Sequence, residues 1–172
     1  QTEEILQKIE EAEYVLVGLG QEFDMEFFLQ SREDYRRIRE QLQQQNVLWL
    51  LPYVEAQFRK QYMPEMEAEI EKGLQKLAKV LEKKSYFVVS SSMNHKLAEV
   101  PWKKMLLKKE RFVAPCGDWT KKQCPDGCEE GIQTVTEADE EQLQESFKKL
   151  QTNGFSVPDL GKCPKCGKKL VL

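Results

Sequence analysis

The sequence has no long apolar run. Its longest, residues 47–51, is far shorter than the roughly 20 residues that a membrane-spanning helix needs. The first residues, QTEEILQKIEEAE, are acidic and amphipathic, which excludes a secretory signal in this stretch. The net charge of −3 provides no excess of basic residues for nucleic acid or for a membrane surface. We therefore expect a cytoplasmic protein with no nucleic-acid partner and no membrane partner.

Histidine is nearly absent, with His95 as its only example, whereas the five cysteines are strongly patterned. Cys124 and Cys128 lie in C-P-D-G-C, and Cys163 and Cys166 lie in C-P-K-C-G. Two short knuckles that each supply two sulfurs are typical of a tetrahedral zinc site. In a chain without an export signal, this pattern favours a metal over disulfides and indicates a reducing compartment. The alternative is a set of free thiols in a loop.

The predicted zinc is structural, because four thiolates leave no open coordination position for a substrate. The 34 residues between the two cysteine pairs exceed the 15–20 of a compact zinc ribbon. A helix predicted near residues 138–151 fills this gap as an insertion, and Thr136 begins a cap-like segment before it.

Three segments are predicted to form strands. Residues 14–20 are an apolar run of the kind found in a strand buried on both faces of a parallel sheet. Residues 85–90 form a second strand, and residues 111–115 form a weaker third one. Residues 21–83 are expected to be mostly helical, and the highly charged part over 31–45 is expected to be solvated.

The alternation of strands and helices implies parallel strands joined by crossovers. In such sheets, ligands gather at the carboxyl ends of the strands. Six residues stand at or just after the predicted ends and are candidates to meet there: Gly18, Gly20, Ser90, Ser92, Asn94 and Cys116.

These features, in this order, resemble the sirtuins, the NAD-dependent protein deacylases, and more narrowly the divergent bacterial sirtuin-like proteins. The resemblance rests on the glycine strand end, the long helical stretch, the second strand with its polar tip, a short strand leading to Cys116-Gly117, and the four-cysteine module. It implies an α/β fold with a Rossmann-like parallel sheet and a small zinc-ribbon lobe.

The resemblance also implies a division of the chain. Residues 1–119 would form a Rossmann-like nucleotide-binding portion with a helical insertion at about 21–83, and residues 120–172 would form the zinc-binding lobe. Sirtuins continue beyond their zinc module into further strands. We therefore expect the sheet to be incomplete at the C-terminus, and leave open whether the chain is a fragment or another chain completes the sheet.

By the same resemblance, Gly18 and Gly20 would face the phosphates of NAD, and Ser90, Ser92 and Asn94 would line its nicotinamide end. The match is uneven. Ser92 replaces the asparagine of the family, and Asn94 replaces its aspartate. Glu22, after the two glycines, would bring negative charge near a pyrophosphate.

Cys116 stands where the family carries its catalytic histidine. A thiol with an ordinary pKa of about 8.5 acts as a base only if its thiolate is stabilised. Cys116 therefore has three interpretations: a pocket residue that replaces the histidine, an inert half-buried thiol, or a metal ligand that displaces Cys124 or Cys128.

Two functions follow from the resemblance. In the first, the protein binds zinc and NAD or a related nucleotide, and transfers an acyl or ADP-ribosyl group from or to a protein, so that an acylated or ADP-ribosylated protein is its partner. In the second, the substitutions at Ser92, Asn94 and Cys116 leave a catalytically inactive binding or scaffold module.

Overall fold

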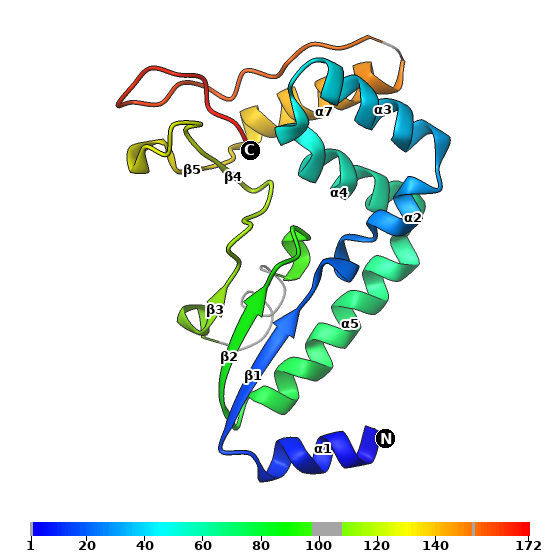
Figure 1. Cartoon of the computed structure of the whole chain (residues 1–172), viewed down its shortest axis with the longest axis vertical. Coiled ribbons are helices and arrows are strands. Elements are labelled where there is room, and N and C mark those ends of the chain that lie inside the picture. The colour runs from blue at the N-terminus through cyan, green and yellow to red at the C-terminus, as the bar shows by residue number, and fades with distance from the viewer. Residues whose placement is uncertain (1, 98–107, 153) are drawn as a thin grey trace. The chain divides into compact units, whose positions relative to one another are not determined.

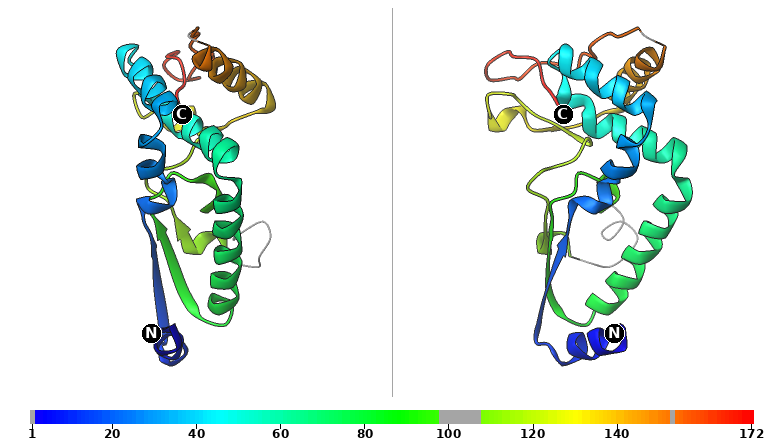
Figure 2. Two further views of the ribbon diagram at one scale, coloured as in Figure 1. Left: turned by 90° about the vertical axis from the view of Figure 1, so that its right-hand side faces the viewer. Right: turned by 45° about the vertical axis from the view of Figure 1, so that its right-hand side comes forward.

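The computed structural model describes residues 2–97, 108–152 and 154–172 (Figures 1 and 2). The chain divides into two compact units, each made from two separate stretches. The first unit comprises the described residues of Gln1–Phe23 and Pro64–Cys116, and the second those of Asp24–Met63 and Gly117–Leu172. This division differs from the predicted one at residues 117–119 and at residues 24–63, which share a hydrophobic core with the cysteine-rich region and group with it.

The first unit contains a parallel three-stranded sheet in the order β1-β2-β3. β1 (Tyr14–Leu19) pairs over its whole length with β2 (Ser85–Ser90), and β3 (Phe112–Val113) pairs with the end of β2. The predicted α/β class with parallel strands is therefore confirmed, whereas a Rossmann-like fold stays a prediction. The predicted crossover from the second to the third strand falls largely on residues 98–107, outside the described residues.

One helix, α5 (Pro64–Leu81), covers one face of this sheet, as both views of Figure 2 show. Its proline fits the first turn because the ring fixes φ near the helical value. Leu74 and Leu81 recur at helical spacing and pack with Tyr86 and Val88 of β2 in one buried cluster. The helix therefore packs against the face of β2 on which Tyr86 and Val88 lie.

The opposite face of the sheet is exposed. Leu16 of β1 and Phe87 of β2 are partners in the strand register, and they are 75% and 41% exposed. The prediction that residues 14–20 are buried on both faces is thus wrong. Side chains alternate between the two faces of a strand, and here α5 covers only one of them.

The second unit contains the helices α2 (Glu26–Gln30), α3 (Glu33–Gln44), α4 (Leu51–Tyr62) and α7 (Glu137–Gln151). The ring of Phe58 in α4 makes edge-to-face contacts with Tyr35 of α3 and Phe147 of α7, at centroid distances of 5.5 and 5.8 Å. The charged segment predicted to be solvated thus also has a buried stripe, because Tyr35, Ile38 and Leu42 face this core.

Short elements complete the described structure. α1 (Thr2–Glu11) precedes β1, and the Lys84 ammonium donates to the carbonyl oxygens of Glu10 and Ala12 at its end. β4 (Lys121–Lys122) and β5 (Gln133–Thr134) form an antiparallel pair. Single 3-10 turns lie at η1 (Gln21–Asp24), η2 (Leu48–Leu50), η3 (Lys109–Arg111) and η4 (Glu129–Gly131).

Candidate metal centre

The first cysteine pair lies on a tight turn that follows β4. The N–H of Gly127 donates to the carbonyl oxygen of Cys124 at 3.0 Å, and Gly127 has φ of +72°, which glycine adopts at little steric cost. The backbone N–H groups of Asp126 and Cys128 donate to the sulfur of Cys124. The C-P-D-G-C sequence therefore forms a loop that directs backbone donors at a sulfur, as thiolate ligands require.

Gly131 supports this knuckle, and the sequence reasoning missed it. A Cβ atom at this position would lie 2.5 Å from the Cβ of Cys124 and 2.9 Å from its backbone nitrogen. No side chain fits there without moving the cysteine. The signal in the sequence was a glycine three residues after Cys128, which by spacing alone is an ordinary turn residue.

The second knuckle is closed by two backbone hydrogen bonds. The N–H of Cys163 donates to the carbonyl of Lys168 at 2.8 Å, and the N–H of Gly167 donates to the carbonyl of Cys163 at 2.9 Å. Gly167 has φ of +73°, and the N–H of Lys168 donates to the sulfur of Cys166. Glycine is favoured directly after this cysteine pair because it adopts a positive φ at little steric cost.

The two knuckles are joined to each other by backbone pairing. Gln123, just before the first pair, exchanges two hydrogen bonds of 2.7 and 2.9 Å with Val171, which follows the second pair. An exposed ion pair of 2.7 Å between Lys168 and Asp126 also spans the knuckles. Exposed pairs of this kind contribute at most about 1 kcal/mol, so the backbone pairing sets the geometry.

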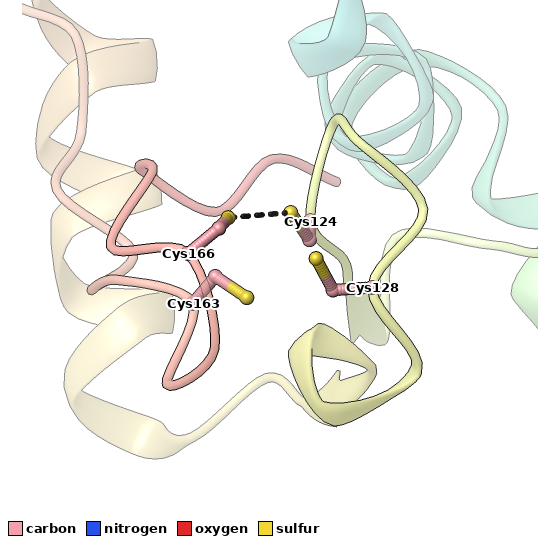
Figure 3. A group of neighbouring side chains, drawn as sticks. All are labelled: Cys124, Cys128, Cys163 and Cys166. Carbon is pink, nitrogen blue, oxygen red and sulfur yellow. Dashed lines mark hydrogen bonds between the residues drawn. The ribbon is translucent and has the colours of Figure 1, made fainter.

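The four sulfurs of Cys124, Cys128, Cys163 and Cys166 all lie within 4.8 Å of one another and point into one common space (Figure 3). The Sγ atoms of Cys124 and Cys166 are 3.4 Å apart, and all four cysteines are free of disulfides. Zn–S bonds of about 2.3 Å place the sulfurs of a tetrahedral site about 3.8 Å apart. The predicted set of four metal-binding cysteines is therefore brought together, in a cluster with the dimensions of a zinc site.

The protonation of the cluster indicates a need for a cation. Burial raises the pKa of Cys124, but the backbone donors of Asp126 and Cys128 outweigh it and lower the value to about 7. The hydrogen bond to Cys124, followed by burial, raises the pKa of Cys128 to about 12. Four thiolates cannot accumulate side by side, because like charges repel. A divalent cation removes this penalty, and the thiolate is the form that binds it.

At the carboxyl edge of the parallel sheet, the candidate nucleotide residues lie on adjacent strands. Gly18 is the register partner of Val89. Leu19 is the partner of Ser90, and its carbonyl accepts a hydrogen bond of 2.9 Å from the N–H of Ser91. The structure thus brings the first two strand ends together, as the sequence predicted.

The polar side chains at this edge are turned inward. Asn94 is 1% exposed; its amide donates to the carbonyl of Phe23 at 3.1 Å, and its oxygen accepts from the N–H of Lys96 at 3.1 Å. Ser92 is 3% exposed and accepts from the N–H of Asn94, while the hydroxyl of Ser90 donates to the carbonyl of Ser92. These groups join the end of β2 to the loop after β1.

At the predicted phosphate site, an acidic side chain covers Gly20, whereas nothing lies within 4 Å of a Cβ built on Gly18. A Cβ built on Gly20 would lie 2.1 Å from a carboxylate oxygen of Glu22, so the Glu22 side chain occupies the space above this glycine. A carboxylate in this position repels the phosphates of a dinucleotide.

Cys116 lies three residues after the end of β3 and is exposed. Among the described residues, the cluster able to hold a metal consists of the four paired cysteines and does not include Cys116. Of its three interpretations, the metal ligand therefore has no geometric support, and the exposed position of Cys116 does not match the half-buried thiol.

The sequence matches no protein-family model and no curated protein. None of the helices in the described part of the chain is both long enough and apolar enough to cross a membrane.

Proposed function

We propose that this chain is a zinc-stabilised, sirtuin-like binding module that does not itself carry out NAD-dependent group transfer. The observation that carries the proposal is the convergence of four cysteine sulfurs within 4.8 Å, from two knuckles separated by a 15-residue helix. Zinc held by Cys124, Cys128, Cys163 and Cys166 has no open position, so its role is to fold and cross-link the two knuckles.

The lack of group transfer is supported by the state of the sheet edge. The side chains of Asn94 and Ser92 form hydrogen bonds with the protein backbone, and the side chain of Glu22 lies over Gly20. A catalytic edge needs polar groups directed at the ligand, and rearranging these residues exposes buried backbone partners. In this proposal the polar residues at the carboxyl edge of the sheet connect the end of β2 to the loop after β1, and the protein acts by binding.

Metal analysis and an NAD assay test the proposal together. We expect about one zinc per purified chain, loss of order in the cysteine-rich region on chelation, and no nicotinamide release from NAD with acylated or ADP-ribosylated peptides. Less than about half an equivalent of zinc contradicts the metal role. Nicotinamide release that depends on this chain contradicts the binding role.

A second candidate is an NAD-dependent deacylase or ADP-ribosyltransferase. One observation favours it: Cys116 is exposed just beyond β3, at the same carboxyl edge as Ser90 and Asn94, and an exposed thiol is available to a ligand. Titration with NAD tests its first step. Saturable binding together with nicotinamide release that Cys116→Ser abolishes supports this candidate, and no binding at millimolar NAD excludes it.

A further inference from the structure

A cavity lies in the first unit, at the opposite end of β2 from Ser90. It is a cavity of about 350 Å³ between the first residues of β2 and the segment 108–111. Among the seven lining residues that the structure describes, four are cationic, namely Lys83, Lys84, Lys108 and Arg111, and Glu82 is the one carboxylate. These described lining residues thus carry a net charge of +3, in a chain whose total is −3.

Tyr86 organises this cavity. Its ring is 8% exposed and packs under α5, and its hydroxyl accepts the backbone N–H of Lys108 at 2.9 Å. The guanidinium of Arg111 lies 5.1 Å from the centroid of the same ring. A cation stacked on an aromatic face is held in place while its N–H groups stay available to a ligand. The tyrosine therefore fixes Lys108 and Arg111 beside the start of β2.

The lysines have different roles. The ammonium of Lys84 donates to the carbonyls of Glu10 and Ala12, so its position is set by the end of α1. Lys83 and Lys108 are exposed, and neither forms an ion pair with a carboxylate in the part of the chain that the structure describes. The four cations outnumber Glu82, the carboxylate among the described lining residues, so they repel one another, and an anion relieves that repulsion.

We propose that this cavity binds a small phosphorylated molecule of mononucleotide size, with its phosphate groups held by Lys83, Lys108 and Arg111. The volume lies at the lower end of the range for small-molecule sites. Lysine and arginine are the side chains that bind phosphate oxygens most strongly, and arginine forms bidentate hydrogen bonds with them. The hydroxyl of Ser85 is a further donor at the lining.

This site is separate from the zinc cluster and from the carboxyl edge of the sheet, so its test is independent of the proposed function. The probes are ADP and inorganic pyrophosphate, titrated by calorimetry into the zinc-loaded full chain. We expect both to bind, and binding to weaken as salt rises, because exposed charges are screened. Amide resonances of Ser85, Tyr86 and Lys108 should shift on binding, while those of Ser92 and Asn94 should not.

The discriminating variant is Lys83→Gln/Lys108→Gln, which removes two exposed charges without touching Tyr86 or Lys84. Losing two charge-assisted contacts should weaken binding at least about tenfold. The matched control is Lys76→Gln/Lys79→Gln, which removes the same charge from the exposed side of α5 and should leave binding within about twofold. The proposal is overturned if neither probe binds, if the variant and the control weaken binding equally, or if the shifts centre on residues 90–94.

Discussion

The ammonium of Lys122 lies 2.8 Å from Oδ2 of Asp139, and both side chains are less than 10% exposed. The same ammonium donates to the carbonyl of Leu160 at 2.8 Å, while the carboxylate of Asp139 accepts the N–H of Thr136 in the capping box of α7. One buried ion pair therefore links β4, the start of α7 and the approach to the second knuckle.

Replacing Lys122 with alanine should destabilise the protein by about 3–5 kcal/mol, because it leaves the Asp139 carboxylate buried without its cation. Urea unfolding of the zinc-saturated protein measures this loss. Lys121→Ala is the matched control, since Lys121 is the exposed neighbour on the same strand and should cost no more than about 0.5 kcal/mol. Equal losses in both variants would show that the ion pair is not the linking element.

Single cysteine substitutions should distinguish the four metal-binding cysteines from Cys116, which is not a metal ligand in the proposed site. Cys163→Ser is expected to lower the zinc content from about one equivalent to well below half, and to unfold the cysteine-rich region, because three thiolates do not close the site. Cys116→Ser should keep its full equivalent. Metal analysis after gel filtration measures both. Zinc loss in Cys116→Ser would assign that residue to the metal site and contradict the cluster of four.

The metal site was largely predictable from the sequence, because its information is local. Each knuckle is a turn of a few residues, in which cysteine spacing and the required glycines specify the geometry. The helix between the two pairs was predictable for the same reason, since Thr136 and Asp139 cap it within four residues. What remained hidden was Lys122, since a lysine on a two-residue strand gives no sign that it is buried.

The grouping of residues 24–63 with the cysteine-rich region was not predictable. In α3, the spacing of Tyr35, Ile38 and Leu42 indicates one buried face, but no pattern within a helix names the surface that it meets. Here that surface includes Phe147, more than 100 residues further on, reached through Phe58. Similarly, the sequence of the polar turn 90–94 is typical of a ligand site. It does not show that the amide of Asn94 donates to the carbonyl of Phe23, which is distant in the sequence.

Asn94 should therefore act as a structural residue. Asn94→Ala removes the donor to Phe23 and the acceptor for Lys96 in a buried position, so we expect a loss of about 2 kcal/mol in unfolding free energy. Ser91→Ala, at the exposed position of the same turn, should cost less than about 0.5 kcal/mol. If Asn94→Ala is as stable as Ser91→Ala but weakens NAD binding, the residue is a ligand contact and the structural assignment is wrong.

Glu55 should make the second unit less stable as the pH rises. Burial raises the pKa of Glu55 from 4.5 to about 6, although the Tyr35 hydroxyl donates to it at 2.6 Å and Arg59 is nearby. The folded state holds this proton more tightly than the unfolded state. The contribution of Glu55 to stability is therefore highest below pH 4.5, falls as the pH rises to about 6, and stays lower above it.

Glu55→Gln keeps an acceptor for Tyr35 and removes the buried charge, so it should stabilise the protein by about 2 kcal/mol at pH 8 and by little at pH 4.5. Unfolding of both proteins by urea at several pH values, at constant zinc, gives the difference, in which the other titrating groups cancel. Glu141→Gln, an exposed position of α7, is the control and should track the wild type. A constant offset between Glu55→Gln and wild type at every pH would mean that Glu55 has the same pKa in the folded and unfolded states, and would contradict its raised pKa.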